Sequence, residues 1–339
     1  MNNRAGAWSG GGVYWHTPTL NAFAIKTQPS KRFIEIRNLD DGYEPDRCAE
    51  NTRKLIGEDV FALFGYVGTP TSLAALPQAT KAKIPFIAPF TGAMSLRDPF
   101  NRYAFHLRAS YADETALMVK QLTTLNLNRI AVFYQNDAYG KAGLDGATQA
   151  LNSYGLKTVS QATVERNSVD VSAAVKQLVA ASPQAVVMVS AYKSCAAFIR
   201  EARKAGYGGV FYNVSFVGTQ ALADELGKDG AGVVVSQVVP SPYNVSRPIA
   251  REFVEAIKTA GGNVKANFSS MEGYLAARLF VEGLKKAGPK ASRDSLITGL
   301  ESIGSQPFGG FSVSLSPTSH VASSFVELSL LTGDGRVRT

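Results

Sequence analysis

Several short apolar runs of the chain are followed by side chains that can bind a small molecule. Hydroxyls and the N–H groups at a helix N-terminus bind anions such as carboxylates, and aromatic rings form apolar walls. A single serine or threonine at a helix start more often serves only as an N-cap. A series of such loops after successive strands instead favours a ligand-binding cleft. The candidate residues are Thr69, Thr71 and Ser72; Phe90, Thr91 and Gly92; Tyr139; Tyr192; and Ser215 and Phe216.

Motifs for catalysis and for metal binding are missing from the sequence. GxSxG, GxxxxGK(S/T) and HExxH do not occur, and GxGxxG does not follow the first expected strand. His16, His106 and His320 lie far apart in sequence, without the spacing of metal ligands. Cys48 and Cys195 cannot form a disulfide framework or a four-ligand zinc site. We therefore expect no enzymatic activity, no cofactor, no metal site and no disulfide.

The composition is that of a folded protein with a diffuse positive charge. The 339 residues contain 35 Lys and Arg and 27 Asp and Glu, which gives a formal net charge of +8. No run of five basic residues occurs, so nucleic-acid binding is not expected. Apolar residues make up 45% of the chain, and no apolar stretch approaches the roughly 20 residues of a transmembrane helix. The length suggests two domains.

Strand-like and helix-like segments alternate from residue 33 onward. This alternation with short loops predicts an α/β fold with parallel sheets, arranged as two doubly wound lobes. A single barrel is the alternative geometry, and the hairpin-like end of the chain after residue 310 argues against it. The expected strands are 33–37, 60–65, 85–89, 129–134, 156–162, 185–190, 210–213 and 233–238. The expected helices are about 45–56, 72–82, 113–125, 141–154, 171–181, 195–205, 247–260 and 271–287.

Residues 1–32 differ from the rest of the sequence. No acidic residue occurs before Glu35, and the longest apolar stretch in this segment is residues 22–25. A secretory signal needs an apolar core of roughly 7–15 residues, which is not visible here. We therefore expect residues 1–32 to be an irregular leader.

Three stretches of this sequence resemble the leucine/isoleucine/valine-binding family, the type I periplasmic solute-binding proteins of ABC importers. They are FALFGYVGTPTS (61–72), IPFIAPFTGA (84–93) and IAVFYQNDAYG (130–140), with agreement at LDDGYEP (39–45), SSMEGY (269–274) and the tail from residue 316. The resemblance covers about residues 33–339. It implies two Rossmann-like lobes joined by a three-strand hinge, a ligand between the lobes, a periplasmic location and an ABC permease of the inner membrane as partner.

Carried onto this sequence, the resemblance gives roles to the candidate residues. The loops at 69–72 and 90–92 are expected to clamp a ligand carboxylate, and Tyr139 and Tyr192 to contact the ligand from lobe 2. The family's amino-acid binders carry an acidic residue where this chain has Ser215, and residues 213–218 contain no acid. We therefore expect a small carboxylate-bearing ligand, and expect acids without an α-amino group to bind better than leucine or valine.

The lobe boundaries are predicted from the strand–helix alternation, which restarts near Asp113, and from the late strand expected over 325–331. Lobe 1 is expected over 33–115 and 245–320, and lobe 2 over 116–242 and 323–339. Nothing in residues 1–32 resembles the family's first strand, so we expect a truncated or altered start and a first sheet without its usual central strand. The alternative function is a ligand-sensing domain of a regulatory or receptor protein with the same fold, although residues 1–32 do not read as a helix-turn-helix.

Overall fold

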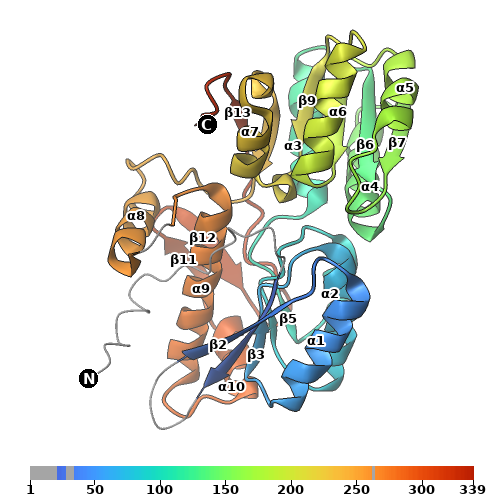
Figure 1. The fold of residues 1–339 in the computed structure, drawn as a ribbon. Coiled ribbons are helices and arrows are strands. Elements are labelled where there is room, and N and C mark those ends of the chain that lie inside the picture. The colour runs from blue at the N-terminus through green and yellow to red at the C-terminus, as the bar shows by residue number, and fades with distance from the viewer. Residues whose placement is uncertain (1–20, 28–33, 262–263) are drawn as a thin grey trace. The chain divides into compact units, whose positions relative to one another are not determined.

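Two open sheets, one in each of two units of the chain, make up the fold of residues 21–27, 34–261 and 264–339, which this computed structural model describes (Figure 1). The two-lobed α/β fold predicted from the sequence is confirmed, and the single barrel is excluded because the described strands of the two units form separate open sheets of five and seven strands. Of the described residues, unit 1 contains those up to Thr91, Ser95–Arg108 and Pro240–Ser324. Unit 2 contains Gly92–Met94, Ala109–Val239 and Phe325–Thr339.

The sheet of unit 1 has the strand order β2-β1-β3-β4-β5. Its strands are β1 (Asn21–Thr27), β2 (Ile34–Asp40), β3 (Ala62–Phe64), β4 (Phe86–Ile87) and β5 (Ala104–Phe105). Strands β3, β4 and β5 are parallel to one another, whereas β1 is antiparallel to both of its neighbours.

Strand β1 corrects one expectation from the sequence. Residues 1–32 were predicted to be an irregular leader, and that is wrong for Asn21–Thr27, which pair on both sides with β2 and β3. Only four consecutive apolar residues mark this segment, too few to show a strand period. The pairing satisfies its backbone N–H and C=O groups all the same. The strand holds a central position in the sheet but is antiparallel to its neighbours there.

Helices and a hairpin complete unit 1. They are α1 (Pro45–Gly57), α2 (Thr69–Lys81), α8 (Pro248–Ala260), α9 (Phe268–Ala287), α10 (Arg293–Glu301), and the hairpin β11 (Gly304–Phe308) with β12 (Phe311–Leu315). Helices α1 and α2 pack together, and so do α9 and α10. Apolar side chains of α1, β3, α2 and β4, among them Leu55, Leu63, Ala75 and Phe86, form a shared core.

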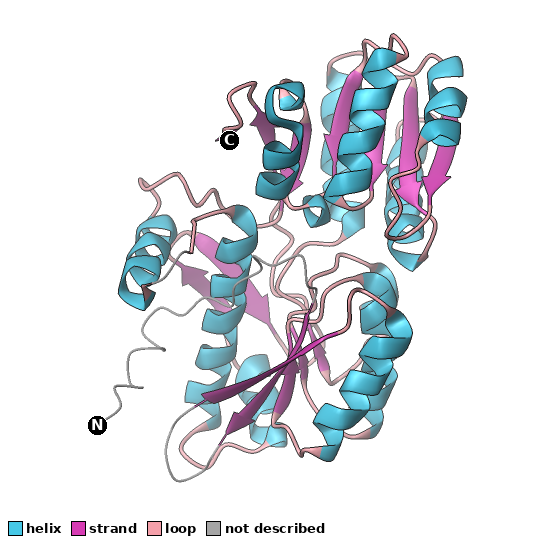
Figure 2. Ribbon diagram, in the orientation of Figure 1, coloured by secondary structure: helices cyan, strands magenta, loops and turns pink. Residues whose placement is uncertain are grey.

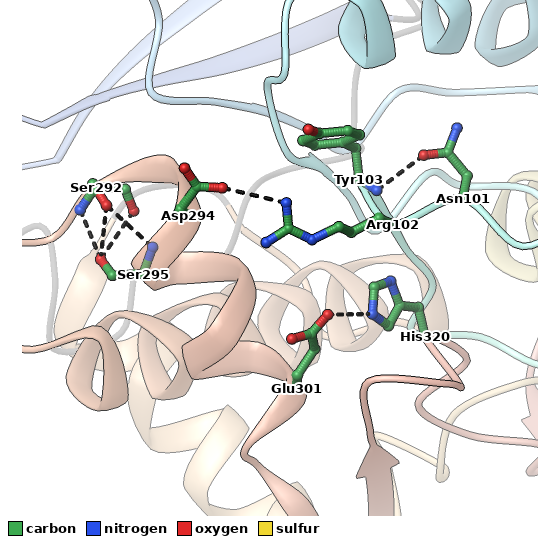
Figure 3. Close-up of polar contacts among 8 residues, drawn as sticks. All are labelled: Asn101, Arg102, Tyr103, Ser292, Asp294, Ser295, Glu301 and His320. Carbon is green, nitrogen blue, oxygen red and sulfur yellow. Dashed lines mark hydrogen bonds and ion pairs between the residues drawn. The ribbon is translucent and has the colours of Figure 1, made fainter.

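Polar contacts attach α10 to the loop before β5, through Arg102, and to the segment after β12, through His320. Arg102 Nη1 lies 3.4 Å from Asp294 Oδ1, and His320 Nε2 lies 3.3 Å from Glu301 Oε1 (Figure 3). The helix itself begins with a capping box, in which Ser292 and Ser295 exchange side-chain and backbone hydrogen bonds (Figure 3). Burial lowers the pKa of His320, while its contacts with Ala104 O and Glu301 oppose this shift.

The sheet of unit 2 has the strand order β14-β13-β10-β9-β8-β6-β7. Its strands are β6 (Ile130–Gln135), β7 (Ser160–Val164), β8 (Ala185–Val189), β9 (Val210–Asn213), β10 (Val234–Gln237), β13 (Glu327–Leu331) and β14 (Val337–Arg338). Strands β6 to β10 run parallel, and β13 joins β10 antiparallel. The strand expected over 156–162 begins later, at Ser160.

The helices of unit 2 form two groups around this sheet (Figure 2). Helix α3 packs on α4, while α6 contacts both α5 and α7. Their bounds are α3 (Tyr111–Thr124), α4 (Ala138–Asn152), α5 (Ser172–Ala180), α6 (Tyr192–Lys204) and α7 (Thr219–Leu226). The apolar core between strands and helices includes Phe133, Met188, Phe198 and Phe211. Among the described residues, no helix is both long and apolar enough to cross a membrane.

Candidate ligand-binding site

The carboxyl ends of β3 and β4 bring two candidate threonines of unit 1 together. Thr69 begins α2 after β3, and Thr91 follows β4. Their Oγ1 atoms lie 2.6 Å apart, and both residues are fully buried. The backbone joins the same two loops, since Gly68 N–H donates to Phe90 O over 3.2 Å. The adjacent parallel strands therefore place the two loops side by side, as expected for open α/β sheets.

The hydroxyls of Thr71 and Ser72, also at the start of α2, differ in their hydrogen bonds. Thr71 Oγ1 donates to Val67 O and lies 3.1 Å from Gly68 O, so its single proton is used within the first turn of α2. In this structure Thr71 therefore stabilises the helix start, and its expected place in the ligand site stays a prediction. Ser72 Oγ is buried and has no hydrogen-bond partner among the described residues.

Two glycines let the candidate loops approach their neighbours closely. Gly68 has φ +95°, and a Cβ at this position would lie 2.1 Å from Tyr43 Cε2. A Cβ on Gly92 would lie 2.6 Å from the backbone nitrogen of Tyr111. Both positions therefore need glycine, the first because of its left-handed backbone and both because of close packing.

A buried arginine contacts the Phe90 loop, and no sequence pattern pointed to it. Arg108 is 1% exposed, its guanidinium carbon lies 4.4 Å from the centre of the Phe90 ring, and its Nε lies 3.3 Å from Glu272 Oε1. Arg97 Nη2 donates to Arg108 O over 3.0 Å and lies 3.4 Å from Thr91 O. These contacts fix the Phe90–Thr91 loop from one side. Only the fold brings Glu272, on α9, to this place.

The loop after β2 also lies near the start of α2. Asp41 is buried, and its Oδ1 accepts the N–H of Tyr43 over 2.8 Å. Burial raises the pKa of Asp41 from 3.8 to about 6, although the Tyr43 N–H and the Cys48 side chain oppose this rise. Asp40 and Asp41 thus form the turn before α1. Among the described residues, no cluster of His, Cys, Asp and Glu could hold a metal ion.

Tyr139 is buried inside unit 2. It was expected in a loop, but it is the second residue of α4, which Asp137 caps by accepting the Tyr139 N–H over 2.9 Å. Its ring centre lies 4.4 Å from that of Phe216 and 5.4 Å from that of Tyr111. Its hydroxyl donates to Ser190 O over 3.4 Å. Tyr139 and Phe216, together with Tyr111, therefore form one group of contacting rings.

Tyr192 was also expected in a loop and is instead the first residue of α6. It is only partly buried and packs against the apolar core of unit 2. Its ring therefore packs partly against the core, and its expected contact with a ligand stays a prediction.

Ser215 and Phe216 belong to a short 3₁₀ turn, η3 (Ser215–Val217), that follows β9. Both are buried, at 7% and 8% exposure. The Ser215 N–H donates over 2.7 Å to Oε2 of Glu114, which lies on α3. The Glu114 carboxylate therefore lies next to Ser215, although residues 213–218 contain no acidic residue of their own. The pair is 101 residues apart, so no local pattern could have revealed it.

Comparison with known proteins gives the same assignment as the fold. A family model described as "Periplasmic binding protein" matches residues 30–326. The chain belongs to the periplasmic binding protein family. Its solved relatives include a possible leucine/isoleucine/valine-binding protein from Rhodopirellula baltica SH 1, 36% identical over 88% of this chain and 83% of that chain, with a TM-score of 0.85.

Two further relatives extend the comparison. A substrate-binding periplasmic protein from Ralstonia solanacearum is 29% identical over 88% of this chain and 86% of its own, with a TM-score of 0.81. Leu/Ile/Val-binding protein homolog 7 from Brucella suis is 24% identical over 274 residues, 73% of this chain. The match spans 65% of the length of that relative. The resemblance to type I solute-binding proteins found in the sequence is thereby confirmed, and such proteins are binding proteins rather than enzymes.

Proposed function

We propose that this protein is an extracytoplasmic solute-binding receptor of an ABC importer of the branched-chain amino acid type. It binds a small carboxylate-bearing ligand with residues of both lobes and delivers that ligand to a permease of the inner membrane. Family membership supports the receptor role. The observation that carries the choice of ligand is the pair of contacting, buried hydroxyls of Thr69 and Thr91 at the ends of two adjacent strands.

A carboxylate ligand is proposed because this site offers hydrogen-bond donors that can replace the water a carboxylate loses on binding. A carboxylate that leaves water needs several converging donors in return. A threonine hydroxyl can donate a hydrogen bond to a carboxylate, and Thr69 and Thr91 place two such hydroxyls 2.6 Å apart. The N–H groups of Thr69 and Thr71 precede the first backbone hydrogen bond of α2, which the Ser72 N–H donates to Gly68 O over 3.1 Å, and this end of the helix carries a partial positive charge. Ser72 adds a buried hydroxyl.

A melting-temperature screen with acids and their neutral amides tests this proposal. The probes are L-leucine, L-valine, L-phenylalanine, 4-methylpentanoate and 3-phenylpropanoate, each beside its amide. A ligand that binds only the folded state at 100 times its Kd adds about 2.7 kcal/mol to the stability. We expect at least one acid to raise the melting temperature and its amide to raise it less. If no acid raised it, or if amides did so equally, the proposed carboxylate site would be contradicted.

Two matched variants show whether the response in this screen depends on the hydroxyl of Thr91. Thr91→Val removes the buried hydroxyl next to Thr69. Thr259→Val removes an exposed hydroxyl on α8 that donates only to Glu255 O, over 2.9 Å. Only the first variant should weaken the response to the acid.

A further inference from the structure

Two histidines that are far apart in the sequence, His106 and His320, are joined inside unit 1. They are 2% and 3% exposed. The His106 N–H donates to His320 O over 2.8 Å, and the Ala322 N–H donates to His106 O over 2.8 Å. This histidine pair therefore connects the segment after β5 to the segment after β12. The chain passes from unit 1 to unit 2 shortly after each histidine, at Ala109 and at Phe325.

The ring of His106 has a partner for only one of its two nitrogens. Its Nε2 lies 3.1 Å from Leu96 O, and because a carbonyl oxygen can only accept, Nε2 carries the proton of the neutral ring. Its Nδ1 is buried without a hydrogen-bond partner among the described residues. Protonation of the ring would place an N–H at Nδ1 without an acceptor, and a positive charge out of water. The site therefore fits the neutral imidazole and not the imidazolium.

The charged and titratable groups that face His106 also disfavour its protonation. Arg97 faces it from the position after η2 (Met94–Leu96), and His320 faces it from the segment after β12. Neither group can supply the negative charge that a protonated His106 would need. Burial first, and then the charge of Arg97, lower the pKa of His106 well below its ordinary value of 6.5.

The ring of His320 differs, because both of its nitrogens face acceptors. Its Nδ1 lies 3.1 Å from Ala104 O, and its Nε2 lies 3.3 Å from the carboxylate of Glu301 on α10 (Figure 3). The ring stacks on Phe105, with 3.8 Å between the ring centres. A second proton on His320 would therefore have an acceptor and a countercharge. Of the pair, only His106 has no acceptor for a second proton.

Arg97 connects the histidine pair to the candidate ligand-binding loop of unit 1. Its Nη2 donates to Arg108 O over 3.0 Å and lies 3.4 Å from Thr91 O. A positive charge on His106 would repel this guanidinium, which holds the loop after β4. Loss of the contacts around His106 would thus loosen both the two joined segments and the Phe90–Thr91 loop.

We propose that the histidine pair is an acid-sensitive contact of unit 1, in which His106 takes up a proton only when the pairing of the two segments opens. Mildly acidic pH then favours the open form and loosens the Phe90–Thr91 loop with it. The inference concerns unit 1 alone and holds whichever ligand the receptor binds. The sign follows from linkage, because a form in which His106 is in water binds more protons below about pH 6.5 than the closed form does. The stabilisation is complete above this pH and is lost as the pH falls.

Hydrogen exchange of the full chain at pH 7.5 and pH 5.0, corrected for the intrinsic exchange rate, tests the proposal. Between these pH values, the protection of residues 104–108 and 320–324 should fall by at least about tenfold. The upper limit is about 30-fold, since linkage allows about tenfold for each pH unit below 6.5. Strand β8 in unit 2 serves as the internal reference and should change by less than about threefold.

Two glutamine variants assign the effect to one ring. His106→Gln can still donate to Leu96 O but does not titrate, so the fall in protection should shrink to less than about threefold. His320→Gln retains the His106 ring and should retain the fall. A fall below about threefold in the wild type, or an equal fall in His106→Gln, would overturn the proposal.

An NMR titration of the wild-type histidine rings keeps the proposal falsifiable if a variant fails to fold. The His106 ring should remain neutral in the folded protein down to at least about pH 5.5, below the ordinary histidine range. A His106 ring that took up its proton in the folded protein at about pH 6.5 or above would overturn the proposal.

Discussion

Replacing Arg108 by methionine tests how the Phe90–Thr91 loop is held. The arginine is 1% exposed and contacts both the Phe90 ring, at 4.4 Å, and Glu272 Oε1, at 3.3 Å. Methionine is of similar length but carries no charge. The substitution therefore removes the ion pair and the cation–π contact while the buried space stays largely filled.

The expected loss of stability follows from the burial of both partners. Glu272 is 7% exposed, so its carboxylate loses this ion pair in a region nearly without water. Removing one member of a buried pair typically costs about 3–5 kcal/mol. The double variant Arg108→Met/Glu272→Met removes both charges, and apolar replacement of a complete buried pair is often nearly neutral. We expect it to regain at least half of the loss.

Urea unfolding measures the free energy of unfolding of the wild type, of the single variants Arg108→Met and Glu272→Met, and of the double variant. Arg102→Met is the control, because Arg102 and its partner Asp294 have side chains that are 49% and 80% exposed. Such exposed pairs contribute about 0–1 kcal/mol. A loss below about 1 kcal/mol for Arg108→Met, or a double variant as unstable as the single one, would refute the role that we give to this buried pair.

Three more outcomes are expected. Thr91→Val should weaken binding of a ligand carboxylate by roughly 10- to 100-fold in calorimetry, since it removes a hydroxyl that contacts Thr69; unchanged affinity would exclude Thr91 from the site. Gly68→Ala should lower the free energy of unfolding by about 1–3 kcal/mol, because its Cβ would meet Tyr43 and its φ is +95°; a neutral result would show that the loop rearranges. The raised pKa of Asp41 means that the folded state binds the proton of this carboxyl more tightly than the unfolded state does. The stability of the folded state is therefore highest, as far as this group is concerned, below about pH 4, and it falls as the pH rises through about 6. Asp41→Asn should therefore gain stability over the wild type between pH 4 and pH 7, by at most about 3 kcal/mol in urea unfolding, and a constant difference across this range would contradict the shift.

The parts of the fold that could be predicted from the sequence are those with a strong local pattern. Continuous apolar runs such as 60–65 and 185–190 became buried parallel strands, because a strand covered on both faces needs apolar side chains throughout. Strand β1 was missed because its segment has only four consecutive apolar residues. Helix starts were placed too late at Tyr139 and Tyr192, since a short loop and the first turn of a helix contain the same kinds of residue.

The candidate site shows the same limit more clearly. The spacing of Thr69 and Thr91 after successive strands predicted that they lie in neighbouring loops, and their hydroxyls are in contact. The charged groups could not be found in this way. Arg108 and Glu272, or Glu114 and Ser215, are brought together by packing between distant segments, and each taken alone has the sequence context of an ordinary helix or strand end.

The most direct test of the account is the calorimetric Kd of the wild-type protein for L-leucine and L-valine compared with their amides. The account predicts that at least one of these acids binds and that its amide binds at least about tenfold more weakly, because the amide lacks the charge that the hydroxyls and the N-terminus of α2 recognise. Equal affinity for acid and amide would contradict the carboxylate site, and no binding of either acid or of any other acid of the melting-temperature screen would contradict the assignment of this protein as a receptor for a small carboxylate-bearing ligand.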